Sequence, residues 1–336
     1  MAKWEIEVRN IELELAERFV IARETWDAAS NVFVMVTFEG TTGLGEVQPA
    51  GRWDESVESV MEELSSLDLE DLPDPFALEA ISEMLPAGSA RSALDIAMHD
   101  LAGKVAGVSV SQILGVSGRT PPPTSVTVGI GTPDEMLRRA EKLADHPILK
   151  VKVGFDGDVD FVTQLREIYK GAVRIDANEG WSEDVAIDRL TRMEPLDIEL
   201  CEQPIPAGDP DALQRVAEAT RIPVFADEDV CTAADVARLR RVVDGVNLKL
   251  RKCGGIREAV KAISVARASG MGVMLGCDLV SGIAATAEAH VAALVDHADI
   301  DGPLLLANDP YPGVTYDRGH VTIPEGPGLG VKQGPR

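Results

Sequence analysis

The sequence contains no run of about 18 apolar residues, so it offers no segment long enough to cross a membrane as a helix. Its first residues, MAKWEIEVRN, lack the basic-then-apolar pattern of a secretory signal peptide. Cysteine is scarce, and the 4 cysteines include no C-x-x-C pair, which is typical of reduced thiols. We therefore expect a cytoplasmic protein with no membrane partner.

Basic residues are also few, with 32 Lys and Arg against 56 Asp and Glu and a formal net charge of −24. Such a surface repels phosphates, so we expect no nucleic acid and no anionic membrane as a partner. The acidic excess is consistent with an ordinary acidic surface or with a salty habitat, and composition does not decide between them. No G-x-G-x-x-G or Walker pattern follows the first strands, which weighs against nucleotide binding.

Two patterns do stand out, one on each side of the Pro-rich segment 119–123. Before this segment, apolar alternation at 4–14 and 32–38 predicts antiparallel strands. Helical periodicity follows at about 54–65, 76–84 and 88–105. We therefore expect residues 1–118 to form an α+β domain.

After the Pro-rich segment, short apolar runs alternate with amphipathic helices, which predicts a parallel sheet. Seven such runs and an eighth near residues 298–306 fit a closed barrel better than an open sheet. We assign residues 119–308 to this barrel and expect 309–336 to return to the first domain. The seven runs are SVTVGI, ILKVKVG, VRIDAN, IELCEQP, PVFADED, GVNLKL and GVMLGC.

Charged residues stand at the ends of these otherwise apolar strands. They recur 22 to 26 positions apart, which is one βα repeat, so they lie at one level near the carboxyl end of the barrel, where barrel enzymes keep their chemistry. Alternation along a strand places Lys150 on the same side as Lys152, and Asn178 on the same side as Asp176. The charged residues are, in order, Lys152, Asp176, Glu202, Asp227 and Lys249.

These residue types match one chemistry. Three carboxylates on adjacent strands, Asp176, Glu202 and Asp227, suit Mg²⁺. A cation can stabilise the enediolate that forms when a weakly acidic α-proton leaves a carboxylate substrate. Lys152 and Lys249 flank the three carboxylates, so one lysine can remove the proton and the other can return it from the opposite side.

A second ammonium at Lys150 is expected to lower the pKa of Lys152 and help it to act as a base. The alternative interpretation of all these charges is a set of internal salt bridges that closes the barrel.

At these residues the sequence resembles the enolase superfamily, specifically its muconate-lactonizing-enzyme subgroup. The likeness spans nearly the whole chain through SALDIAMHDLAGKVAG, K-V-K, D-A-N, E-Q-P, A-D-E, N-L-K and G-P-G-L-G. It implies an α+β capping domain over a modified (β/α)₇β barrel, and a superfamily that usually self-associates. It also implies that Asp176, Glu202 and Asp227 bind Mg²⁺ and that Lys152 and Lys249 are the acid–base pair.

Within this subgroup the sequence is most similar to the dipeptide epimerases. Asp299-Ile300-Asp301 resembles their D-x-D element, which binds the free α-ammonium group of the substrate. Two carboxylates suit a primary ammonium with its three donors. The alternative is an ordinary acidic loop. Asn178 and Glu228 are expected to support the site, with Glu228 pointing to the side of the strand opposite Asp227.

Two departures bear on the substrate. Glu24 stands where acidic-dipeptide epimerases carry an arginine, although the neighbouring Arg23 leaves the register open by one. Asp278 replaces the usual methionine after the seventh strand. Together the two acids predict a preference for dipeptides with Lys or Arg side chains. The alternatives are a solvated loop charge for Glu24 and a helix N-cap for Asp278. Trp26 and Trp53 either line the pocket or pack.

Two other functions remain open from the sequence. The first is another reaction of the subgroup, such as N-acylamino acid racemisation or o-succinylbenzoate synthesis, whose substrates lack a free α-ammonium group. The second is a catalytically silent binding protein on the same scaffold, which the intact lysines and carboxylates disfavour. The leading hypothesis is a Mg²⁺-dependent dipeptide epimerase that uses 1,1-proton transfer.

Overall fold

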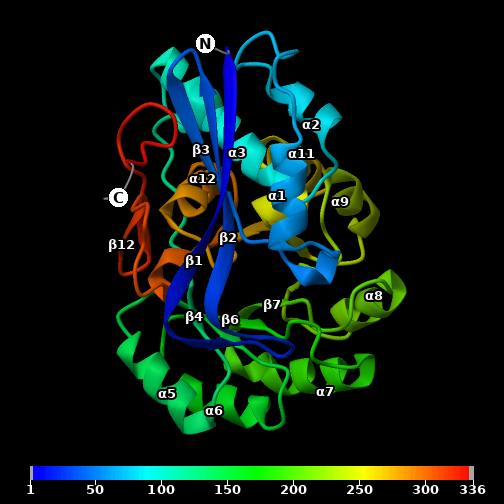
Figure 1. Cartoon of the computed structure of the whole chain (residues 1–336). Coiled ribbons are helices and arrows are strands. Elements are labelled where there is room, and N and C mark those ends of the chain that lie inside the picture. The colour runs from blue at the N-terminus through cyan, green and yellow to red at the C-terminus, as the bar shows by residue number, and fades with distance from the viewer. Residues whose placement is uncertain (1–2, 333–336) are drawn as a thin grey trace.

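Apolar alternation near the N-terminus produces a three-stranded antiparallel sheet in the order β1-β2-β3 (Figure 1). The structure is a computed structural model that describes residues 3–332. β1 is longer than the sequence predicts, because pairing with β2 resumes at Phe19↔Trp26 after an irregularity. The β1–β2 connection therefore reaches far from the rest of the sheet. The strands are β1 Trp4–Val20, β2 Thr25–Phe38 and β3 Thr41–Val47.

One long, buried helix, α3, packs on this sheet. Glycines allow the close contact: a Cβ at Gly43 would lie 2.1 Å from the carbonyl oxygen of Ala97, and one at Gly45 would lie 2.0 Å from that of Ala93. The helix predicted at 76–84 is a 3₁₀ turn followed by one α-helical turn. The elements are η1 Gly51–Trp53, α1 Val57–Ser65, η2 Leu78–Ala80, α2 Ile81–Met84, α3 Ser89–Ala106 and α4 Val110–Ile113.

The second half forms eight parallel strands in the order β11-β10-β9-β8-β7-β6-β5-β4. A parallel bridge between Thr124 and Ala298 joins the two ends of this order and closes the barrel. All eight predicted strands are present. They are β4 Val126–Val128, β5 Ile148–Lys152, β6 Ala172–Asp176, β7 Ile198–Glu202, β8 Val224–Ala226, β9 Gly245–Leu248, β10 Gly272–Gly276 and β11 His297–Asp299.

Helices follow each of the first seven strands, and the eighth is followed only by a 3₁₀ turn. The architecture is a modified (β/α)₇β barrel with an α+β capping domain. Figure 1 shows helices α5–α7 around the lower part of the barrel, with β1 and β2 reaching down towards it. The elements are α5 Pro133–Lys142, α6 Asp158–Ile168, α7 Glu183–Met193, η3 Glu194–Leu196, α8 Pro210–Glu218, α9 Ala233–Leu239, α10 Leu250–Cys253, α11 Ile256–Ala268, α12 Gly282–Ala292 and η4 Gly302–Leu305.

The strand register brings the charged residues to one level. Lys152 pairs with Asp176, and Asp176 pairs with Glu202 on the next strand. On the far side, Gly276 pairs with Asp299. Because neighbouring parallel strands end together, these side chains meet at the carboxyl end of the barrel.

The C-terminal segment contains a short hairpin, β12 Thr315–Asp317 and β13 His320–Thr322. Beyond it, the backbone N–H of Leu329 donates to the Asp100 carboxylate of α3, at 2.8 Å. Gly328 exchanges backbone hydrogen bonds with Val108 and Val110. The segment thus contacts the capping domain. Within residues 3–332, no helix combines the length and apolar character that a membrane crossing requires.

Candidate active site

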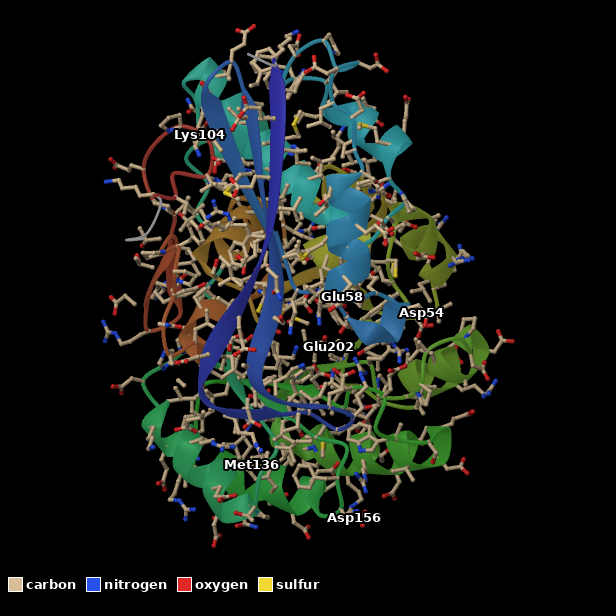
Figure 2. All side chains as sticks on the ribbon, in the orientation of Figure 1. Asp54, Glu58, Lys104, Met136, Asp156 and Glu202 are labelled. Carbon is tan, nitrogen blue, oxygen red and sulfur yellow. The ribbon has the colours of Figure 1, made fainter. Side chains whose placement is uncertain are left out.

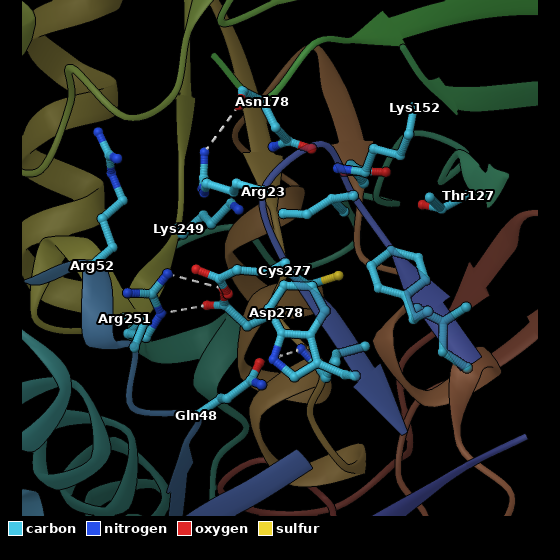
Figure 3. A pocket seen from close by; sticks show the side chains of 18 of the residues that line it. Arg23, Gln48, Arg52, Thr127, Lys152, Asn178, Lys249, Arg251, Cys277 and Asp278 are labelled. Carbon is cyan, nitrogen blue, oxygen red and sulfur yellow. Dashed lines mark hydrogen bonds and ion pairs between the residues drawn. The ribbon is translucent and has the colours of Figure 1, made fainter. Parts of the chain in front are cut away.

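A cavity lies between the capping domain and the carboxyl end of the barrel (Figure 3). The capping domain contributes the two capping loops, which we define as residues 21–24 and 48–53, together with Phe19 and Trp26. Trp26 and Trp53 therefore line the pocket. Nine of the predicted site residues do so as well, namely Lys150, Lys152, Lys249, Asp299, Asp301, Asp278, Glu24, Asn178 and Glu228.

The three predicted metal ligands are almost fully buried, with exposed fractions of 1% for Asp176, 0% for Glu202 and 2% for Asp227. They come from the ends of three consecutive strands, β6, β7 and β8. In the view of Figure 2, Glu202 lies near the centre of the molecule, between Asp54 of the capping domain and Met136 of α5. Three carboxylates so deep in a protein require compensating cations.

Lys150 supplies much of that compensation. Its Nζ lies 3.0 Å from Asp176 Oδ2, 2.7 Å from Glu202 Oε2 and 2.7 Å from Asp299 Oδ2. Burial opposes the charged form, yet the three carboxylates raise the pKa of Lys150 well above its ordinary value. Lys150 is therefore held as an ammonium by its acidic neighbours, and the predicted repulsion between Lys150 and Lys152 is not its dominant interaction.

The two lysines predicted as the acid–base pair contact different carboxylates. Lys152 Nζ donates to Asp176 Oδ2 at 2.7 Å, and Lys249 Nζ lies 3.3 Å from Asp227 Oδ2. Lys252, in the short helix α10 after β9, forms a short contact with Asp227 Oδ1. Burial lowers the pKa of Lys249, but Asp227, Asp278 and Glu202 together outweigh this effect and raise the pKa above its ordinary value.

The donor set fits a divalent cation. Burial raises the pKa of Glu202 to about 8, and the adjacent Asp176 adds to the shift, so a further cation beside this carboxylate would stabilise its charged form. Glu202 Oε2 accepts no hydrogen bond of good geometry despite the nearby Lys150. In residues 3–332, no group of three His, Cys, Asp or Glu side chains already surrounds a common metal position. Lysine ammonium groups contact all three carboxylates instead.

The Asp299–Asp301 pair lies at the end of β11. Ser125 Oγ donates to Asp299 Oδ1 at 2.6 Å, and Lys150 contacts its other oxygen. The backbone N–H of Thr127 donates to Asp301 Oδ2 at 2.7 Å. Asp299 is thus engaged at one oxygen by an ammonium and at the other by a hydroxyl, whereas Asp301 Oδ1 accepts only a long hydrogen bond from the Cys277 thiol, at a sulfur–oxygen distance of 3.7 Å.

The prediction that Glu228 points away from the site is wrong. It lines the cavity, and its Oε1 lies 2.6 Å from Nη2 of Arg23 in the first capping loop. The prediction failed because β8 ends at Ala226, so strand alternation no longer applies two residues later. Asn178 likewise lies beyond its strand, with a φ of 42°, but it still faces the cavity.

Glu179 joins both capping loops to the barrel. Its carboxylate lies 2.8 Å from Arg23 Nη1 and 2.6 Å from Arg52 Nη2, and the backbone N–H of Ala207 also donates to it, at 2.8 Å. Glu24, by contrast, is exposed at the rim and forms no ion pair with any residue of the described chain. The guanidinium in the first capping loop therefore belongs to Arg23, and it is already paired with acids of the barrel.

Asp278 also differs from the prediction. It lines the cavity, but Arg251 binds it through both oxygens, with Nε–Oδ2 at 2.8 Å and Nη2–Oδ1 at 3.0 Å (Figure 3). Its charge is therefore compensated within the protein. The N-cap alternative is also wrong, because Ser281 caps α12 by accepting a hydrogen bond from Ile283.

Sequence reasoning missed four residues that complete this arrangement. Asn247 of β9 donates to Glu202 Oε1 at 2.6 Å, and its position two residues before Lys249, in the predicted strand run GVNLKL, could have revealed it. Lys252, Arg251 and Glu179 follow strand ends in turns or short helices, where no periodic pattern predicts side-chain direction.

These features define a barrel enzyme whose buried lysines and carboxylates meet under a capping domain. The sequence matches the family described as "Mandelate racemase / muconate lactonizing enzyme, N-terminal domain" over residues 3–115. It matches the family "Enolase C-terminal domain-like" over residues 135–334. The chain therefore belongs to the enolase superfamily.

Individual relatives agree with this assignment. The L-Ala-D/L-Glu epimerase of Bacteroides thetaiotaomicron is 38% identical over 95% of this chain and 85% of its own. The substrate-liganded L-Ala-D/L-Glu epimerase of Bacillus subtilis has a TM-score of 0.92 at 32% identity, covering 98% of this chain and 99% of its own. The dipeptide epimerase of Methylococcus capsulatus, complexed with Mg and L-Arg-D-Lys, has a TM-score of 0.87 at 33% identity, covering 97% and 98%. The chain is thus an isomerase of the epimerase type.

We expect Glu179→Gln to raise KM about fivefold with little change in kcat, because partly buried ion pairs of this kind contribute on the order of 1 kcal/mol. The substitution removes the shared anchor of Arg23 and Arg52 and so loosens both capping loops over the cavity. Steady-state kinetics and the rate of tryptic cleavage after Arg23 and Arg52 measure the effect, and cleavage should be faster in the variant.

Glu183→Gln is the matched control, because Glu183 pairs with Arg215 on the outer surface of the barrel. It should leave both KM and the cleavage rate unchanged. Equal cleavage of the Glu179→Gln variant and the unmodified protein would show that Glu179 does not hold the loops.

Proposed function

We propose that the protein is a dipeptide epimerase that acts by 1,1-proton transfer at the carbon next to the substrate carboxylate. The observation that supports this most is the placement of the two lysines. Lys152 ends β5 and Lys249 follows β9, and the three strands between them carry the buried carboxylates. The lysines therefore face the cavity from opposite sides of the barrel mouth.

In the proposed reaction, one lysine in its amine form takes the α-proton, so that a C–H bond breaks and an N–H bond forms. The electron pair moves into the substrate carboxylate and gives an enediolate. The other lysine, as an ammonium, then donates a proton to the opposite face of the carbon. General acid–base groups of this kind contribute roughly 10²- to 10⁴-fold to the rate.

Asp176, Glu202 and Asp227 would hold Mg²⁺. Bound there, the cation would supply positive charge next to the substrate carboxylate, where negative charge develops. It would also balance the negative charge of these carboxylates, which lysine ammonium groups now balance. Asn247 positions Glu202 through its 2.6 Å hydrogen bond, and the backbone N–H of Asn178 positions Asp176, at 2.9 Å from Oδ1.

The proposed dipeptide substrate places its free α-ammonium group at Asp301 and Asp299. Asp301 is the better acceptor, because Asp299 is already engaged by Lys150 and Ser125. This engagement is also the observation that favours the second candidate function. An N-acylamino acid racemase, or an o-succinylbenzoate synthase, would need no free carboxylate at this position.

A preference for cationic dipeptides would rest on Glu24 alone. Its exposed carboxylate at the rim has no partner among the described residues that would cancel its charge. Asp278 cannot add to this preference while Arg251 binds both of its oxygens.

Replacing one lysine should stop proton exchange on only one face of the substrate α-carbon. In D₂O with Mg²⁺, we expect Lys152→Ala and Lys249→Ala each to lose α-hydrogen exchange from one epimer of a dipeptide by about 100-fold or more, while the other epimer still exchanges. The two variants should lose opposite epimers. Proton NMR of L,L and L,D dipeptides follows the exchange.

Lys142→Ala, at an exposed lysine of α5, is the control and should exchange both epimers normally. If the unmodified protein shows no Mg²⁺-dependent exchange with any dipeptide of a broad library, the proposed function is wrong.

Asp301→Asn should raise KM for dipeptides by roughly tenfold to a hundredfold, because an ammonium would lose a buried charged acceptor. KM for N-acylamino acids, if they are turned over, should not change. Asp145→Asn, on the surface, is the control. An equal effect on both substrate classes would argue against ammonium binding here.

Asp301 should also make KM for a dipeptide depend on pH. Burial and the neighbouring Asp299 raise the pKa of Asp301 to about 6. Below that pH the carboxyl is neutral and attracts an ammonium less, so KM for a dipeptide should rise as pH falls through about 6. In Asp301→Asn, KM should not vary over this range.

Glu24→Gln should lower the ratio of kcat/KM for L-Ala-L-Lys over L-Ala-L-Gln by about threefold, as expected for an exposed charge pair. Glu12→Gln, an exposed glutamate of β1 away from the cavity, is the control. An unchanged ratio would show that Glu24 is only a solvated loop charge.

A further inference from the structure

One wall of the active-site cavity is formed by an Arg–Asp pair. Arg251 lies in α10, immediately after the strand that leads to Lys249, and Asp278 lies just beyond β10. Both residues line the cavity, and the guanidinium donates two hydrogen bonds to the carboxylate, at 2.8 and 3.0 Å, one to each oxygen. Figure 3 shows the pair close to Lys249.

We propose that Arg251 and Asp278 act together as a specificity-determining pair, which keeps this wall electrically neutral so that the wall itself selects no charged substrate side chain. Either residue without its partner would select a side chain of the opposite charge. The proposal rests on the proposed epimerase function and concerns which dipeptides that site accepts.

Burial is the first argument. Arg251 is only 7% exposed, and the side chain of Asp278 is 15% exposed. Removing one partner of a buried pair leaves an uncompensated charge, which is far less favourable than the intact pair. The remaining charge would face the cavity, where a substrate group of opposite sign could take the place of the lost partner.

The geometry of Arg251 is the second argument. Its guanidinium carbon lies 4.6 Å from the centre of the Trp53 ring, so the second capping loop covers the pair. A guanidinium that stacks on an indole and forms a two-point contact with a carboxylate has little freedom to turn towards a substrate. The pair therefore presents both charges together, and neither is free to attract a ligand.

A matched pair elsewhere shows what a purely structural role would look like. Arg215 binds Glu183 through the same two-point geometry, at 2.6 and 2.8 Å, on the outer surface between α7 and α8. Neither residue lines the cavity. Breaking that pair should not change the choice of substrate, whereas breaking the Arg251–Asp278 pair should.

The test is a double-substitution cycle with Arg251→Met, Asp278→Asn and the double variant. Values of kcat/KM are measured for L-Ala-L-Lys, L-Ala-L-Gln and L-Ala-L-Glu, and for the same residues in the reverse order. We expect Arg251→Met to raise the Lys/Gln ratio about tenfold and Asp278→Asn to raise the Glu/Gln ratio about tenfold. The double variant should return both ratios to within about threefold of the unmodified protein.

Arg215→Met and Glu183→Gln are the matched controls and should leave all ratios unchanged. If Arg251→Met does not fold, Asp278→Asn still decides, because it preserves the size and packing of the side chain. A uniform change for all three substrates would overturn the proposal and indicate that the pair acts on Lys249 or on the fold. Inactivity of the unmodified protein towards every dipeptide would instead refute the proposed function.

Discussion

The buried charge balance at the barrel mouth is the constraint on which the rest of the structure depends. Asp176, Glu202 and Asp227 are removed from water almost completely, and carboxylates in that position are stable only beside cations. Lys150 of β5 and Lys252 of α10 contact them. An arrangement of this kind requires eight strands in fixed register, because a shift of one residue would turn each charge into the surrounding apolar layer.

The capping domain is fixed to the barrel by the same kind of interaction. Glu46 of β3 is buried, and it accepts hydrogen bonds from the backbone N–H groups of Ser281 and Ala284 in the first turn of α12. A carboxylate is favoured at such a helix start. Nearer the cavity, Arg23 and Arg52 reach Glu179 and Glu228. Acids and bases thus position the loops that cover the site, as well as the site itself.

Much of this could be predicted from the sequence, and the failures share a cause. The eight strands and their terminal charges follow from periodicity, which fixes side-chain direction as long as the strand continues. Glu228 and Asn178 lie beyond the last strand residue, so alternation gave no valid direction for Glu228. The partner of Asp278 is 27 positions away in a short helix. Local sequence cannot indicate such a pair, because only the closed barrel brings its members together.

The residues at strand ends and the residues in turns and short helices therefore belong to two groups, one proposed for the reaction and the other for the choice of substrate. The lysines and carboxylates lie at strand ends and compensate one another, so a change at one of them would leave a buried charge on another and disturb the whole group. The residues of the cavity wall come from turns and short helices, and they balance in smaller units such as Arg251 with Asp278. Such a unit carries no net charge, so exchanging both of its members together would leave the net charge beside Lys249 unchanged. A scaffold built this way can keep one reaction while its choice of side chain changes, because selectivity depends on which wall charges are left unpaired.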